Sequence, residues 1–242
     1  GGYNPYQFAP NIWSKIKLLP FPLRKLACSV LSGLPLPDKI QKLLSVFPAK
    51  EQQSFYRLMM SHWVTPTEIV KGSSMSSVFL NSPQDWPQTD SFEHWMMAMD
   101  AGQYMSDDIL VKVDRAAMAN SLETRVPLLD HRVFEFAWQL PQHMKIRNGV
   151  GKWALREVLY RHVPKSMIER PKKGFSIPLA QWLRGPLRDW AENLLSEKRL
   201  INEGYFNPNP IRRAWEQHIT CKADNALKLW SILMFQAWLE VQ

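Results

Sequence analysis

The sequence predicts a mainly α-helical fold, and three observations support this. Apolar residues recur with helical spacing along most of the 242 residues, and many of the 18 prolines stand where helices would begin or end. No run of alternating β-branched residues, and no Asn-Gly or Asp-Gly hairpin between apolar runs, indicates a strand. Hydrophobic residues make up 45% of the chain and include 11 Trp and 11 Phe, which is sufficient for a well-packed core. We expect a single helical domain over residues 1–242.

Prolines divide the first part of the chain into short helices. Pro20 and Pro22 separate two helices in the first apolar region, because proline cannot continue a helix. Pro37 precedes a third helix at about residues 38–46. Pro48 precedes a fourth, which carries the sequence AKEQQSFYRLMMSHW.

A capping box marks the next helix start. Thr65 is followed three residues later by Glu68, and Pro66 occupies the favoured first helical position. The sequence then loses its period at about residues 73–89, where Ser, Pro and Asn are frequent. This composition predicts an irregular loop region.

Helical patterns resume in the second half of the chain. A long helix is expected from Asp90 to about Leu122, with a break near Ser106. The last helix is apolar almost all round, which predicts a central, buried helix, and its polar breaks make it a poor membrane span. Further helices are expected at about residues 131–139, 151–162, 187–196, 209–219 and 224–240.

Charge and cysteine content narrow the functional classes. The formal net charge of +8 indicates attraction to anions, but Trp and basic residues do not interleave as in a nucleic-acid stacking surface, so we expect no nucleic-acid partner. Cys28 and Cys221 lack ligand or CxxC spacing, as do the six histidines, so we expect no metal site and two inert thiols in a reduced, cytoplasmic compartment. No signal peptide or membrane segment is visible. The opening GGYNPYQF has no Met, and we expect a fragment whose natural start lies upstream.

The segment VDRAAMANSLETRVPLLD, residues 113–130, mixes charged and apolar residues most densely. We expect the apolar residues to be buried, and charges rarely enter a core unless they pair. Just before this segment, Asp108 and Lys112 stand four residues apart on a helix and can form an ion pair. The charged residues of the segment are Asp114, Arg115, Glu123, Arg125 and Asp130.

The local geometry of this segment allows two interpretations. A valine before a proline favours extended backbone, so Glu123 and Arg125, two residues apart, should point the same way. In the first interpretation, a salt-bridge network fixes the loop to the helix, and Asp130 caps the next helix. In the second, Arg125 or Arg115 holds an oxyanion.

A second basic segment, ERPKKGFSIP, covers residues 169–178. Pro171 and Gly174 predict a loop, and the glycine would let the backbone approach a ligand closely. Lys172 and Lys173 could then neutralise charge that develops on a leaving pyrophosphate or on a tetrahedral oxyanion. The alternative is an ordinary solvated basic loop.

In combination, these segments resemble the synthetase domain of glutamine-dependent asparagine synthetases. The strongest similarity covers residues 108–141, and residues 151–184 resemble the next block of that family. GGYNPY resembles the end of a GDELFGGYxxY-type motif, and LWSILMFQAWL resembles the closing helix.

The resemblance implies a fold and an activity. The fold would be the helical C-terminal portion of an adenine-nucleotide α-hydrolase-like (PP-loop ATP pyrophosphatase) synthetase domain. Its nucleotide-binding sheet, with the SGGxDS loop, and the glutaminase cysteine are missing from this chain. The complete enzyme would use ATP and Mg²⁺ to convert aspartate into an aspartyl-adenylate, which ammonia from glutamine attacks. We expect the chain alone to be inactive and to bind no cofactor. Its partners would be the upstream nucleotide-binding and glutaminase parts of the same polypeptide. The resemblance leaves open whether the complete protein forms a homodimer.

The resemblance also assigns roles to residues. Lys172 matches the catalytic lysine of the pattern R-x-K-x-x-F-S, where it would contact pyrophosphate and the acyl-adenylate. Around it, the implied nucleotide-binding residues are Lys173, Arg125, Glu123, Arg115 and Asp108. Two alternatives remain. The acceptor could be a sugar or polysaccharide carboxylate, or a β-lactam precursor. The chain could also be a non-catalytic helical interaction module, with apolar surface exposed where the missing sheet would dock.

Overall fold

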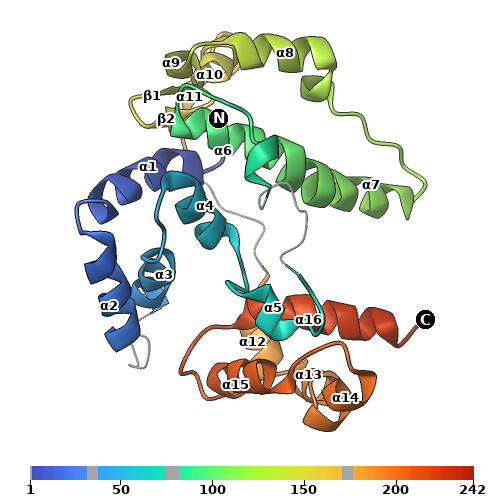
Figure 1. Ribbon diagram of the computed structural model, residues 1–242. Coiled ribbons are helices and arrows are strands. Elements are labelled where there is room, and N and C mark those ends of the chain that lie inside the picture. The colour runs from blue at the N-terminus through green and yellow to red at the C-terminus, as the bar shows by residue number, and fades with distance from the viewer. Residues whose placement is uncertain (1, 32–37, 75–81, 171–176) are drawn as a thin grey trace. The chain divides into compact units, whose positions relative to one another are not determined.

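The computed structural model is mainly helical, as the sequence predicted (Figure 1). It describes residues 2–31, 38–74, 82–170 and 177–242. The chain divides into two compact units, each held together mainly by contacts within it. Unit 1 comprises residues 1–19 and 77–172, and unit 2 comprises residues 20–76 and 173–242. A single helical domain over residues 1–242 stays a prediction, and we describe each unit by itself.

A helical rod forms the centre of unit 1. It runs through α6 (Phe92–Asp100), a π-helical segment (Ala101–Ile109) and α7 (Leu110–Met118). The expected long helix is therefore present, and the break expected near Ser106 is a stretch of wider turns instead of an interruption. The Ser106 hydroxyl donates to the Gly102 carbonyl at 3.1 Å within it. Such π turns often accompany functional sites.

The other elements of unit 1 are each shorter than this rod. Helix α1 (Pro5–Ile16) packs against α6. A 3₁₀ turn (Pro127–Leu129) and α8 (His131–Gln139) follow α7, and α8 has the bounds that the sequence predicted. The chain continues through α9 (Gln142–Lys145), α10 (Trp153–Leu159) and α11 (Lys165–Ile168).

A two-stranded hairpin in unit 1 corrects the sequence analysis. Strands β1 (Ile146–Arg147) and β2 (Val150–Gly151) pair antiparallel, with Ile146 opposite Gly151. The two turn residues, Asn148 and Gly149, have φ values of 51° and 76°. An Asn-Gly pair with both φ values positive is the preferred two-residue hairpin turn. The expectation that no such hairpin exists was therefore wrong.

Unit 2 begins with three helices that the prolines delimit. Helix α2 (Phe21–Leu31) precedes α3 (Asp38–Val46), which packs against α4 (Gln52–Met60). The buried Arg24 guanidinium donates from α2 to the carbonyls of Phe47 and Ala49, at 3.1 and 2.6 Å. These bonds fix α2 to the turn that follows α3.

Helix α5 begins where the sequence placed it, but the predicted capping box does not form. It spans Pro66–Ile69, with the proline at its first position, while the Thr65 side chain makes no capping hydrogen bond. Val70 forms an isolated antiparallel bridge with Phe206, and the Asn207 amide donates to the Glu68 carbonyl at 2.7 Å. These contacts join α5 to the C-terminal helices.

The main core of unit 2 lies among α5 and the last five helices. These are α12 (Leu179–Arg184), α13 (Arg188–Leu194), α14 (Glu197–Glu203), α15 (Pro208–Ile219) and α16 (Ala226–Leu239). Helix α16 was expected to be central and buried on all sides, and this is wrong. It buries Leu229 and Leu233 fully, whereas Leu227 is 61% exposed. Across the described residues, no helix is long and apolar enough to cross a membrane.

Candidate functional site

Most apolar residues of the 113–130 segment are exposed and none is buried, which corrects the expectation that they are buried. Leu122 is 61% exposed and Leu128 57%, and α7, the 3₁₀ turn and α8 bury no residue. Figure 1 shows α7 and the following extended segment leaving the packed part of unit 1. The charged residues here therefore carry no burial cost, and they remain accessible to a ligand or partner.

Glu123 and Arg125 do point the same way, as the sequence predicted. The Arg125 Nη2 atom lies 2.7 Å from Glu123 Oε1, and both side chains are largely exposed. The ion pair joins two neighbours within one loop and does not reach back to the helix. An exposed ion pair of this kind contributes about 0–1 kcal/mol to stability. A phosphate could therefore replace the Glu123 carboxylate as the partner of the Arg125 guanidinium at little energetic cost.

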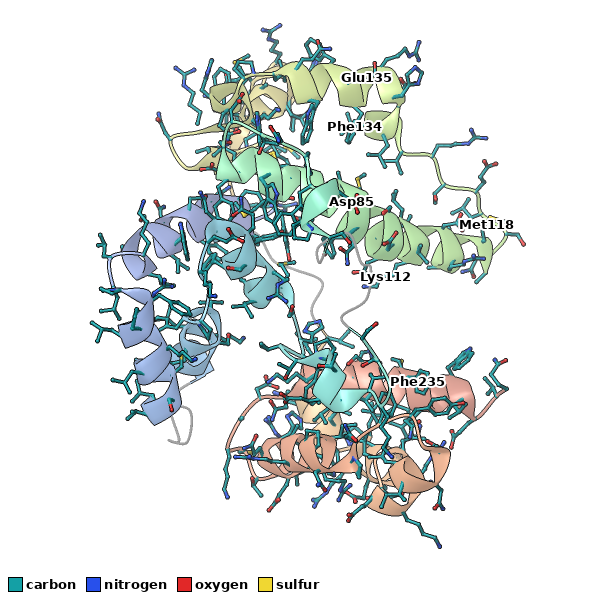
Figure 2. All side chains as sticks on the ribbon, in the orientation of Figure 1. Asp85, Lys112, Met118, Phe134, Glu135 and Phe235 are labelled. Carbon is teal, nitrogen blue, oxygen red and sulfur yellow. The ribbon has the colours of Figure 1, made fainter. Side chains whose placement is uncertain are left out.

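Two further local predictions are confirmed. The Lys112 Nζ atom lies 2.6 Å from Asp108 Oδ1, and Figure 2 shows Lys112 and Met118 projecting from α7. Asp130 caps α8, because its Oδ1 atom accepts from the Arg132 N–H at 3.0 Å. Hydrogen bonds from the Arg132 side chain and backbone hold the pKa of the Asp130 carboxyl below its usual value.

The two lysines with the strongest sequence-based assignment, Lys172 and Lys173, lie outside the described residues. Their predicted roles stay predictions. The described residues that precede these lysines end at Arg170, which directly follows Glu169. Glu169 forms an ion pair with Arg156 of α10 at 3.1 Å.

Gly2 lies against Lys152, a lysine that sequence reasoning had not singled out. A Cβ atom on Gly2 would overlap with the aliphatic carbons of Lys152, so a larger residue here would have to displace the flexible lysine side chain. Lys152 has a left-handed backbone with φ of 57°, which is uncommon for a residue other than glycine. Tyr3 stacks on Tyr104 of the π-helical segment, with ring centroids 5.5 Å apart. The sequence signal that could have identified Lys152 is its position directly between Gly151 and the start of the next helix at Trp153.

An apolar hollow of about 380 Å³ lies between the start of the π-helical segment and α8. Figure 2 shows two of its lining residues, Phe134 and Glu135, on α8. Its remaining lining residues are Ala98, Ala101, Trp138 and Gln139. No residue assigned from the sequence lines this hollow, so it does not gather the expected site.

A buried lysine, Lys145, contacts Trp138, which is one of the residues that line the hollow. Lys145 Nζ donates to the Trp138 carbonyl at 2.8 Å and lies 2.9 Å from His94 Nε2. Burial lowers the pKa of Lys145, and burial together with Lys145 lowers the pKa of His94. His94 is therefore neutral at pH 7 and can accept from the lysine, which fixes the packing of α8 against α6.

The described residues offer cations for phosphate but no cluster for a metal. Arg115, Arg125 and Lys152 are exposed, and each can neutralise a phosphate oxygen. Among the residues that the structure describes, no group of three or more His, Cys, Asp or Glu could hold a metal ion.

Comparisons with known proteins agree with the resemblance found in the sequence. The sequence profile of the asparagine synthase family matches residues 1–240. The chain is 29% identical to the glutamine-hydrolyzing asparagine synthetase 1 of Bacillus subtilis (strain 168), over 98% of this chain and 38% of that protein. It is 30% identical to the glutamine-hydrolyzing asparagine synthetase of Homo sapiens, over 50% of this chain and 24% of that protein. No solved structure matches. The chain thus spans well under half the length of these relatives.

Proposed function

Because the chain belongs to the asparagine synthase family, we propose that it acts as the helical C-terminal part of a glutamine-hydrolysing asparagine synthetase. The family match over residues 1–240, with the motifs in the expected order, carries this proposal. In the complete enzyme, the aspartate side-chain carboxylate attacks the α-phosphorus of ATP and releases pyrophosphate. Ammonia from glutamine then attacks the acyl carbon of the aspartyl-adenylate, and asparagine and AMP leave. The finer fold assignment, a PP-loop pyrophosphatase domain that uses Mg²⁺, belongs to the same proposal.

This chain would contribute positive charge around the phosphates. Lys172, with Lys173 beside it, would neutralise the leaving pyrophosphate, since a lysine is a mobile point charge on a long stem. The exposed ion pair of Glu123 and Arg125 supports a second contact, because Arg125 can exchange its carboxylate for a phosphate. Arg115 and Asp108 would stand at the edge of the same site.

Aspartate is the acceptor that the comparisons favour. The relatives described above are asparagine synthetases, and neither acts by its name on a sugar or polysaccharide carboxylate. The exposed apolar residues of the 113–130 segment also support the docking of a nucleotide-binding part there. A non-catalytic interaction module would share that surface, and it stays the second candidate.

An assay of the complete polypeptide that carries this chain tests the proposal. We expect asparagine formation from aspartate with ATP, Mg²⁺ and either ammonia or glutamine. Lys172→Ala should lower synthesis by at least about a hundredfold and leave glutamine hydrolysis unchanged, as expected when a preorganised charge in a transition state is lost. The 242-residue chain alone should catalyse neither reaction. Unchanged synthesis in Lys172→Ala, or amidation of another carboxylate only, would contradict the proposal.

A further inference from the structure

The hollow between the start of the π-helical segment and α8 combines two aromatic rings with small residues. Phe134 and Trp138 stand one turn apart on α8, and their rings are nearly parallel, with centroids 6.2 Å apart and an interplanar angle of 7°. Each of these residues is 38% exposed, so ring surface is open to a ligand. Ala98 and Ala101 also line the hollow, and their short side chains leave a volume of about 380 Å³. Sites for small molecules have volumes of this order and mostly apolar linings.

A buried lysine and a histidine fix the position of Trp138. The Lys145 Nζ atom donates to the Trp138 carbonyl at 2.8 Å and lies 5.1 Å from the centre of the Trp138 ring. The His94 ring stacks on the indole, with centroids 5.9 Å apart, and Lys145 Nζ lies 2.9 Å from His94 Nε2. A side chain that is already fixed loses little conformational entropy when a ligand binds, and this preorganisation favours affinity.

Glu135 is the charged residue that lines the hollow, and its carboxylate has no cationic partner among the residues that the structure describes. Arg132, one turn earlier on α8, is engaged with Asp130 through two side-chain hydrogen bonds of 2.9 Å each. Glu135 is also exposed. A negative charge is therefore available beside the two aromatic rings.

The hollow also lies where the helical rod of unit 1 changes its geometry. Ala98 belongs to α6, and Ala101 is the first residue of the π-helical segment. Wider helical turns of this kind frequently accompany functional sites. The backbone and the lining side chains thus indicate a binding site independently of each other.

We propose that this hollow binds a small organic cation that consists of a flat apolar ring and an ammonium group. The ring would lie against Trp138 and Phe134, and the ammonium group would pair with the Glu135 carboxylate. Aromatic rings add to the attraction, because their faces are negative and favour a cation. Lys145 sets the orientation of the ligand, since its positive charge beside Trp138 repels the ammonium group toward Glu135.

Charge complementarity separates this ligand from neutral and anionic compounds of the same shape. A neutral ring would leave Glu135 unpaired, and an anion would be repelled by it. An exposed ion pair and a cation–π contact are each weak, and together they favour the cation over a neutral compound by about fivefold. Added salt should reduce this preference, because it screens exposed charges.

Titration of the complete polypeptide with 2-phenylethylamine at pH 8 tests the site. The probe is a cation at this pH, 2-phenylethanol is its neutral counterpart, and phenylacetate is an anion of similar size. The signal is the ¹⁹F resonance of Trp138 in protein labelled with 5-fluorotryptophan, which Trp138→Phe assigns. We expect the amine to shift this resonance to saturation, the alcohol to bind about fivefold more weakly, and phenylacetate to have no effect.

Two variants separate the charge of the site from its volume. Glu135→Gln should weaken binding of the amine to the level of the alcohol and leave binding of the alcohol unchanged. Glu157→Gln removes an exposed carboxylate from α10 in the same unit and is the matched control, which should change neither affinity. Ala98→Leu should fill part of the hollow and prevent binding of both compounds, with an unchanged thermal midpoint.

Three results would overturn the inference. The first is a Trp138 resonance that the amine does not move, which also covers the case that another part of the polypeptide occupies the hollow. The second is equal affinity for the amine and the alcohol. The third is an affinity for the amine that Glu135→Gln leaves unchanged, and this variant decides the question even if Ala98→Leu does not fold. The titrations contain neither ATP nor aspartate, so their outcome does not depend on whether the enzyme makes asparagine.

Discussion

The Tyr6 hydroxyl donates a 2.5 Å hydrogen bond to Asp100 Oδ2, and both side chains are buried. The bond joins two segments separated by 94 residues. It ties α1, which follows the opening glycine pair, to the end of α6, where the π-helical segment begins. Tyr3 stacks on Tyr104 beside it, so the N-terminal turn and the wider helical turns form one packed region of unit 1.

Replacing Tyr6 by Phe should destabilise unit 1 by about 1–3 kcal/mol, because a buried carboxyl loses this donor. Burial and the bond to Asp100 raise the pKa of Tyr6 above its usual value. The folded state therefore keeps the phenol proton, and this contribution is present below about pH 10 and is lost as the pH rises further. Urea unfolding at pH 8 and pH 11 measures both effects.

The control for this prediction is Tyr205→Phe, because Tyr205 is about half exposed. It should leave the free energy of unfolding within about 0.5 kcal/mol of the unmodified chain. An alkaline loss of stability that is equally large in Tyr6→Phe and in the unmodified chain would show that Tyr6 is not its source.

Helix bounds could be predicted where local chemistry decides them. Asp38–Val46 and His131–Gln139 match the sequence-based ranges, since a proline or a capping aspartate lies close to each start. The hairpin at Asn148 and Gly149 was missed because its strands have two residues each, too few to show an alternating pattern. The Asn-Gly pair was itself the sufficient signal.

Burial could not be predicted in the same way, because it depends on what covers a surface. Leu122 is as apolar as any core leucine, yet it is 61% exposed. The ion pair of Glu123 and Arg125 could be predicted because it depends only on a two-residue spacing in extended backbone. The position of Lys172 relative to that pair is a tertiary relationship. No local pattern contains it.

Two leucines on α16 test how that helix packs. Leu229→Ala should lower the free energy of unfolding by about 2–5 kcal/mol, because it opens a cavity in a close-packed core. Leu227→Ala, two residues away on the exposed face, should change it by less than about 0.5 kcal/mol. Chemical unfolding of both variants measures the difference. Equal losses would mean that α16 is covered on both faces, as the sequence alone had suggested.

His218 makes unit 2 sensitive to acid. It is fully buried, and its Nδ1 atom accepts from the Asn225 N–H at 3.3 Å. Burial and the Arg184 guanidinium lower its pKa, while the weaker effects of Asp224 and of a backbone contact with Ala180 oppose them. The fold thus favours the neutral imidazole, and the unfolded chain takes up the proton first as the pH falls through about 6.5. Stability should therefore decrease between pH 7 and pH 5.

Replacing His218 by Asn should flatten this dependence on pH. The amide oxygen can still accept from Asn225, but the side chain cannot be protonated. His218→Asn should be less stable than the unmodified chain at pH 7, since it loses the ring packed against Trp215 at 6.3 Å, and it should lose less on going to pH 5. The exposed His143, replaced by Gln, is the matched control and should keep the acid loss of the unmodified chain. Urea unfolding followed by tryptophan fluorescence measures all three proteins. An acid loss in His218→Asn as large as in the other two would assign the sensitivity to other groups.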